Sequence, residues 1–248
     1  MPHEALIETA GYRARLDAGP DDIARSLALR GRVFRGDPAA SDEDGFDARC
    51  RHLIVEDIAT RAVVASCRLL VIENGAAIGG SYSAQFYSLD GLAGQPGRML
   101  EVGRFCIAPE ARGADVLRLT WGALTQVVEA EEVEMLFGCS SFAGTAPEAY
   151  LDAFALLRAR HLAPPRWLPR IKAPNVFRFG QRPRGKPDLK RALKAMPPLL
   201  RTYLLMGGFV SDHAVIDRDL GTLHVFTGLE VGRVPENRRR ALGALAGA

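Results

Sequence analysis

RMLEVGRFCIAPEARG, residues 98–113, is the stretch of sequence that decides the fold. Three aliphatic side chains give it the apolar content of a strand inside a sheet: Leu100, Val102 and Ile107. The strand stops at Pro109, and a helix is expected over about 115–130, with Asp115 as its cap. A strand that runs into a helix N-terminus is a common place to bind a carbonyl or a phosphate, because unpaired backbone N–H groups point outward there.

Around this unit the hydrophobic periodicity predicts alternating strands and helices. Strands are expected at 5–10, 12–16, 52–57, 62–72, 133–138, 210–217 and 223–231, and helices at 21–34, 148–160, 188–196 and 199–206. Residues 82–89 fit a strand or a helix, and residues 140–145 are predicted to form a loop of small side chains. The order predicts an α/β fold with a mixed, mostly antiparallel sheet flanked by helices, a three-layer α/β/α arrangement.

Length and composition suit one globular domain, residues 1–248, with 48% hydrophobic residues. No apolar run approaches the ~20 residues of a membrane span, and residues 1–5 lack the features of a signal peptide. We therefore expect a cytoplasmic protein. Its four cysteines are scattered without zinc-ligand spacing, so free thiols and no metal site are expected.

The net charge of +3 is the sum of a strongly basic segment and an acidic remainder. Residues 155–206 carry 13 Lys or Arg and one acid, Asp188, which gives +12 and leaves −9 for the rest. Within them, 163–206 form a basic, proline-interrupted, amphipathic helical insertion near the C-terminus. The stretch suits nucleic acid, an acidic carrier protein or an anionic membrane. It lacks nucleic-acid-binding motifs, and its leucines beside Lys and Arg favour peripheral attachment to a membrane surface, which we expect to be the inner membrane.

Charged side chains inside apolar segments are the candidates for chemistry, since a buried charge is costly unless it is paired or used. Glu101 is either a general base or the structural partner of Arg104 or Arg68. The loop 42–47 carries four carboxylates, which are either solvated or capture a cationic amine. Ser140 and Ser141 are interpreted as donors to a carbonyl or to a pantetheine amide, or as strand-end caps, and Cys139 as a conceivable nucleophile.

Seven of these positions, in order, resemble the acyl-homoserine-lactone synthases and their GNAT-fold relatives: Arg30, Phe34, Asp44, Asp47, Arg68, Glu101 and Arg104. Those enzymes transfer an acyl group from a carrier protein to an amine. The lactone synthases carry a tryptophan shortly after the position of Phe34, whereas this chain reads Arg35-Gly36-Asp37-Pro38.

A closer resemblance covers nearly the whole chain and points to the bacterial L-ornithine N(α)-acyltransferases. Its motifs are Asp42-Glu43-Asp44-x-Phe46-Asp47, Cys67-Arg68-Leu69-Leu70, Leu100-Glu101-Val102-Gly103-Arg104, Phe137-Gly138-Cys139-Ser140-Ser141-Phe142 and Gly208-Phe209-Val210-x-Asp212. The resemblance implies transfer of a 3-hydroxyacyl group from acyl carrier protein to the α-amine of L-ornithine, giving lyso-ornithine lipid. Arg112-Gly113-Ala114-Asp115 departs from the pyrophosphate-binding turn of acetyl-CoA-using relatives, which fits a carrier-protein donor and no further cofactor.

The same resemblance assigns roles to single residues. Glu101 and Arg104 are expected to be catalytic, with Glu101 as the base, and Asp44 and Asp47 to bind the substrate dication. Backbone N–H groups of Phe105, Cys106 and Ile107 are expected to hold the oxyanion, and Arg30, Phe34, Arg68, Ser140 and Ser141 to contact substrate. The acyl chain is expected in a groove between residues 82–89 and the helix at 148–157. The alternatives are a lactone synthase and a non-catalytic membrane-surface module on a GNAT scaffold.

Overall fold

The computed structural model describes residues 5–17, 19–37, 39–181 and 186–240. These residues form two compact units, which are described separately. The first comprises Met1–Val71, Leu100–Val133 and Pro235–Ala248, and the second Ile72–Met99 and Glu134–Val234. The predicted fold class is confirmed, because both units combine helices with a sheet whose strands pair mostly antiparallel.

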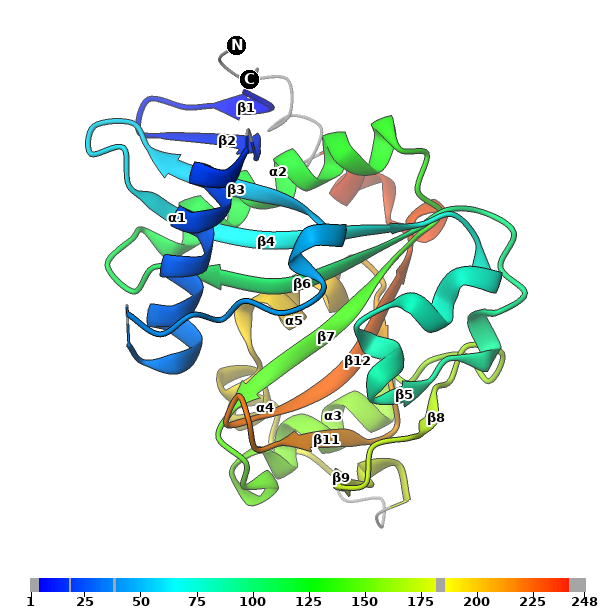
Figure 1. Ribbon diagram of the computed structural model, residues 1–248. Helices are drawn as coiled ribbons and strands as arrows, with labels where there is room; N and C mark the ends of the chain where they lie inside the picture. Colours follow the sequence, from blue (N-terminus) through cyan, green and yellow to red (C-terminus); the bar gives the residue numbers. More distant parts are fainter. Residues whose placement is uncertain (1–4, 18, 38, 182–185, 241–248) are drawn as a thin grey trace. The chain divides into compact units, whose positions relative to one another are not determined.

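The first unit contains five neighbouring strands in the order β1-β2-β3-β4-β6. Their bounds are β1 Ile7–Glu8, β2 Tyr12–Leu16, β3 Arg51–Asp57, β4 Val63–Ile72 and β6 Met99–Ile107. Figure 1 shows helix α1 in front of these strands and helix α2 behind them. The helices span Pro20–Arg30 and Gly113–Ala130, and the short 3-10 turn η2 spans Asp47–Arg49.

Helix α1 is held against the sheet by buried ion pairs. Arg15 of β2 donates to Asp22 of α1 at 2.8 Å and to Glu56 of β3 at 3.0 Å. After Arg30 the helix widens into a π-helical turn, η1 Gly31–Arg35, that ends at Gly36 with a φ of 71°. Only glycine fits at Gly31, since a Cβ there would lie 1.9 Å from the Ala40 carbonyl oxygen. The loop that follows is therefore packed tightly against the end of α1.

The predicted cap of α2 is wrong. The helix begins at Gly113 after Arg112, and no side chain caps it. Asp115 lies in its first turn, where a negative charge still interacts favourably with the helix dipole.

The second unit is built on the long antiparallel pair β7 Met135–Ala143 and β12 Thr222–Glu230. Its other strands are β5 Tyr87–Ser88, β8 Arg170–Ile171, β9 Val176–Phe177, β10 Phe209–Val210 and β11 Ala214–Asp217. Its helices are α3 Leu151–Arg160, α4 Leu189–Ala195 and α5 Pro198–Leu205, with 3-10 turns η3 Gly75–Gly80, η4 Ser83–Gln85, η5 Asp90–Leu92, η6 Pro147–Tyr150, η7 Phe179–Gln181 and η8 Val231–Arg233.

Helices α4 and α5 pack into the core of this unit instead of forming an appendage. Ala192, Met196 and Leu200 are buried in one cluster with Phe154 of α3 and Val225 of β12. The break between the two helices falls at the predicted prolines, with Pro197 between them and Pro198 as the first residue of α5.

Two predicted segments differ from the structure for physical reasons. Residues 140–143 are strand, not loop, because Phe142 is buried in the core and pairs across to Leu223. The predicted strand 210–217 is interrupted, because the hydroxyl of Ser211 donates to the carbonyl of His213 and accepts from the N–H of Phe226.

The predicted acyl groove between residues 82–89 and α3 is also wrong. Tyr87 of β5 packs on His224 and Phe226, whereas the cluster around Phe154 of α3 contains Val225. Alternate residues of a strand point to opposite faces, so the two segments cover opposite faces of β12. Figure 1 shows β5 in front of β12 and α3 behind it.

Candidate active site

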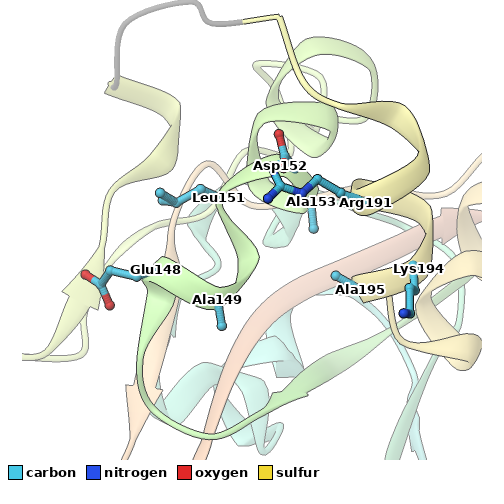
Figure 2. Close-up of a pocket in the computed structure, with 8 residues that line it drawn as sticks. All are labelled: Glu148, Ala149, Leu151, Asp152, Ala153, Arg191, Lys194 and Ala195. Atoms are coloured by element: carbon cyan, nitrogen blue, oxygen red, sulfur yellow. Dashed lines mark ion pairs between the residues drawn. The ribbon is translucent and has the colours of Figure 1, made fainter.

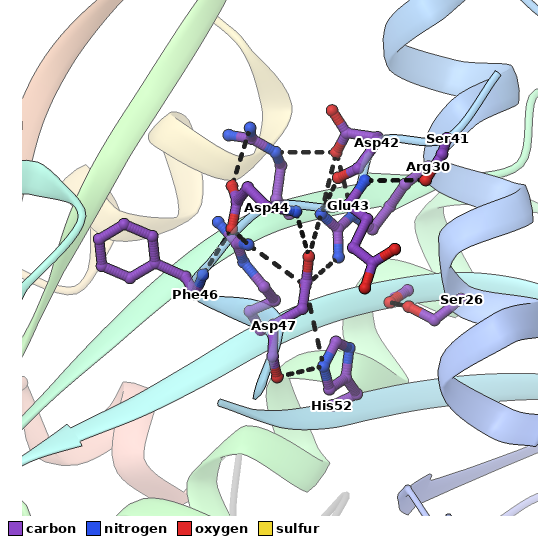
Figure 3. Close-up of polar contacts among 12 residues, drawn as sticks. Ser26, Arg30, Ser41, Asp42, Glu43, Asp44, Phe46, Asp47 and His52 are labelled. Carbon is purple, nitrogen blue, oxygen red and sulfur yellow. Dashed lines mark hydrogen bonds and ion pairs between the residues drawn. The ribbon is translucent and has the colours of Figure 1, made fainter. Parts of the chain in front are cut away.

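A buried network of arginines and aspartates in the first unit defines the candidate site, and Figure 3 shows its polar contacts. At its centre the guanidinium of Arg30, which is fully buried, donates to Asp42 at 3.1 Å and to Asp47 at 2.5 Å. A guanidinium that meets two carboxylates through its planar fork fixes their positions. Because Arg30 is the last residue of α1, the helix end anchors the acidic loop.

Asp42 receives hydrogen bonds from three arginines. Besides Arg30, the Nε atoms of Arg35 and Arg104 donate to it at 3.2 and 2.9 Å. The sequence predicts Asp42 only as one of the four acids of the loop 42–47. No local signal distinguishes it from its neighbours, because the arginines that select it come from distant parts of the chain.

Asp44 and Asp47 have different surroundings. The carboxylate of Asp47 is 4% exposed and is occupied by Arg30 and, at 3.2 Å, by Arg68. That of Asp44 is 27% exposed and is paired with Arg68 and, at 3.3 Å, with Arg104. Asp44 is therefore the more accessible of the two carboxylates, and binding of a substrate amine by Asp44 and Asp47 stays a prediction.

The ion pairs control the ionisation of both carboxyls. Burial tends to raise the pKa of Asp44, but the hydrogen bonds from Arg68 and from the backbone N–H of Phe46 outweigh it and hold that pKa below its ordinary value. Burial likewise opposes ionisation of Asp47, and Arg30 and the N–H of Asp44 keep the pKa of that carboxyl low. Both groups are therefore anionic at neutral pH.

This network predicts acid-sensitive stability. A carboxyl whose pKa is lower in the folded than in the unfolded state stabilises the fold above its unfolded pKa of about 4, and this contribution is lost as the pH falls through the folded value. The free energy of unfolding, measured with urea between about pH 6 and 2.5, should drop below about pH 4. Asp47→Asn should show a shallower drop, and an identical pH dependence in both proteins would contradict this reading.

Glu101 lies on β6 beside the network. Glu101 is buried, with 4% of its surface exposed. Its charge influences the pKa of the Cys50 thiol, and so do the charges of Arg68 and Asp47. Gly103, two residues on, faces Arg68, whose Nε would lie 3.8 Å from a Cβ at that position. Glu101 and Gly103 are two residues apart and so point to the same face of β6, the face that the guanidinium of Arg68 approaches.

The backbone of β6 is irregular at Arg104, three residues after Glu101. Arg104 has a φ of 51°, which is rare for a bulky residue and is strained. Phe34 lies under the Arg104 guanidinium, 6.0 Å from it. The strain falls just before Phe105, Cys106 and Ile107, the residues predicted to donate backbone N–H groups.

The cysteines are free thiols. Burial raises the pKa of Cys106 to about 12 and that of Cys50 to about 11, so both stay protonated at neutral pH. The thiol of Cys139 lies 3.5 Å from the Ser83 hydroxyl. Among the described residues no group of three or more acidic, histidine or cysteine side chains has the arrangement of a metal site.

Ser140 and Ser141 cannot donate to one carbonyl. They are consecutive residues of β7, so their hydroxyls point to opposite faces. Ser140 is buried and accepts a hydrogen bond at 2.9 Å from Thr227, whereas Ser141 is exposed.

A cavity of about 580 Å³ opens in the second unit between α3 and α4 (Figure 2). Apolar side chains line it together with Glu148, Asp152, Arg191 and Lys194. The segment predicted to line the acyl groove, residues 148–157, contributes five of the lining residues, whereas Glu101 and the other individually predicted site residues do not line this cavity.

Known proteins that resemble this chain identify the class of enzyme to which its fold belongs. Residues 29–122 match the family of acetyltransferase (GNAT) domains. A solved CoA-dependent acyl-homoserine lactone synthase, BjaI, has the same fold, with a TM-score of 0.51, 10% identity, and coverage of 96% of this chain and 90% of that one. The fold is that of a GNAT acyltransferase.

Relatives that match nearly the whole length of the chain identify a narrower family. The L-ornithine N(alpha)-acyltransferase of Rhodobacter capsulatus is 34% identical over 92% of this chain and 93% of its own length. Those of Brucella abortus and Rhizobium meliloti are 32% and 30% identical, covering 97% and 98% of this chain and 89% and 88% of their own. The chain belongs to the L-ornithine N(alpha)-acyltransferase family, and it is an acyltransferase.

Proposed function

We propose that this chain transfers a 3-hydroxyacyl group from acyl carrier protein to the α-amine of L-ornithine and releases lyso-ornithine lipid. The relation to the Rhodobacter capsulatus enzyme over nearly the whole of both chains carries the proposal. The acidic, half-buried Asp44 at the edge of the network suits a substrate that carries two ammonium groups.

In the proposed reaction the α-amine attacks the thioester carbonyl carbon. Glu101 accepts the proton that the amine loses, directly or through a water, because a carboxylate that is desolvated beside cations can serve as a general base. The C–N bond forms first and gives a tetrahedral intermediate, and the C–S bond breaks as this intermediate collapses, so the carrier leaves with its pantetheine thiol, which takes up a proton. Backbone N–H groups of 105–107 stabilise the oxyanion of the tetrahedral intermediate.

Arg30, Asp42 and Asp47 act as positioning residues in this scheme. They are buried, and they hold the loop that presents Asp44 and the guanidiniums of Arg68 and Arg104. A site held within narrow limits by such contacts keeps the amine and the thioester oriented for reaction.

The test is the mass of the product. The purified chain with 3-hydroxyacyl carrier protein and ornithine should form N-acylornithine and free carrier thiol in equal amounts. Parallel reactions contain S-adenosylmethionine, lysine or glutamine in place of ornithine, and parallel donors include the same acyl group on coenzyme A. A lactone product from S-adenosylmethionine, with none from ornithine, would overturn the proposal.

A further inference from the structure

The outward faces of α4 and α5 combine exposed leucines with cations. Leu189 and Leu193 are 45% and 51% exposed, and Leu205 of α5 is 60% exposed. On a helix, residues four apart share one side, so Leu189 and Leu193 form one strip. Lys190 and Lys194 form the adjacent strip, and both are exposed.

In the sequence the apolar residues of 189–205 look like one continuous face. In the structure some of them are buried in the core and others are exposed. Ala192, Met196 and Leu200 point into the core, which leaves Leu189, Leu193 and Leu205 outside. These leucines are not needed to pack the unit. An exposed apolar strip beside cations is the pattern of a helix that lies in the surface of a membrane.

We propose that this surface, defined as Leu189, Lys190, Leu193, Lys194, Arg201 and Leu205, seats the protein on an anionic bilayer. Among the described helices none is long and apolar enough to cross a membrane, so attachment through them would be peripheral. Within α4 and α5 there are four basic side chains and no acidic one, which complements the negative surface of anionic lipid.

The charges around the neighbouring cavity favour a bilayer over an acidic protein as the occupant. The cavity side of α4 faces Glu148 and Asp152, and Asp152 lies 3.9 Å from Arg191 (Figure 2). An acidic partner that entered there would meet these carboxylates. Of the proposed surface only Lys194 also lines the cavity, whereas its three leucines, Lys190 and Arg201 lie outside the lining and can meet a bilayer without these carboxylates.

This inference rests on the proposed function in one respect: the single-chain product would be released next to the bilayer that receives it. The docking itself requires no catalysis, so it is tested separately.

The test is binding of the full chain to vesicles. Wild type should bind vesicles that contain phosphatidylglycerol, bind pure phosphatidylcholine vesicles much less, and lose affinity as salt is raised. Lys190→Glu/Lys194→Glu should weaken binding at least ~10-fold, since each basic residue near an anionic surface contributes about 1 kcal/mol. Leu189→Ser/Leu193→Ser should weaken it by a similar factor, because the apolar contact is lost.

A matched control carries the same charge change elsewhere. Arg118→Glu/Arg218→Glu alters two exposed arginines outside this surface and should retain most of the binding. Circular dichroism checks that each variant is folded. In vesicle-free solution both surface variants should acylate ornithine at the wild-type rate. Absence of that activity in wild type would refute the proposed function and leave the vesicle result standing.

Three results would overturn the docking proposal. The first is no vesicle binding by wild type, and the second is equal vesicle binding by wild type and both surface variants. The third is unchanged vesicle binding together with a raised KM for the carrier protein in the Lys190→Glu/Lys194→Glu variant, which would assign the surface to the carrier.

Discussion

Glu101→Gln is expected to lower kcat for acylation of ornithine by about 10²- to 10⁴-fold, the range for loss of a general base. The amide has the size of the carboxylate but cannot accept the proton of the attacking amine. Because proton transfer occurs in the transition state, kcat and kcat/KM should fall by the same factor. Single-turnover formation of N-acylornithine measures the effect.

The control for this variant is Glu43→Gln. Glu43 is an exposed carboxylate on the same acidic loop, and its substitution makes the same change of charge. It should leave kcat close to that of wild type. Full activity of a folded Glu101→Gln protein would reject Glu101 as the base and favour a structural ion pair.

Arg30→Met is expected to destabilise the protein by about 3–5 kcal/mol, the cost of removing one partner of a buried ion pair. Methionine fills much of the space but leaves Asp42 and Asp47 without the guanidinium that joins them. The free energy of unfolding in urea measures this loss. Arg32→Met, which removes an exposed ion pair with Glu110, should cost about 1 kcal/mol or less.

A second variant tests whether the loss comes from the buried acid that Arg30 no longer neutralises. Adding Asp47→Asn to Arg30→Met should restore part of the stability, because a neutral amide costs less to leave buried than a charge does, and Arg68 keeps Asp44 as its partner. A loss of stability in Arg30→Met no larger than in Arg32→Met would show that the network does not hold the loop.

The sequence predicts the elements of this fold well where one short stretch contains the signal. The apolar run around Leu100 and the proline at 109 give the strand and its end, and Pro197-Pro198 separates two helices as expected. The prediction is wrong where pairing with a distant segment determines the secondary structure. Ser140 and Ser141 belong to a strand and not to a loop, because β12 pairs with β7 from Met135 to Ala143.

In the candidate site, too, some residues can be recognised from the local sequence and others only from the fold. Glu101, Arg104 and Arg68 stand out in the sequence because charges interrupt apolar strands. The hub at Asp42 and the interior position of Asp47 do not, because four neighbouring acids look equivalent until the arginines of α1, β4 and β6 select among them. The sequence likewise does not tell which segment covers which face of β12. The structure shows that Tyr87 packs on one face, at Phe226, and Phe154 on the other, near Val225.

The central claim is that this chain joins an acyl group to the α-nitrogen of ornithine. Tandem mass spectrometry of the product formed from ornithine and 3-hydroxyacyl carrier protein tests it most directly, because fragments distinguish an α-amide from a δ-amide. We predict the α-amide alone, with at most about 1% of the wild-type amount formed by Glu101→Gln in the same time. A δ-amide, or equal product from both proteins, would contradict it.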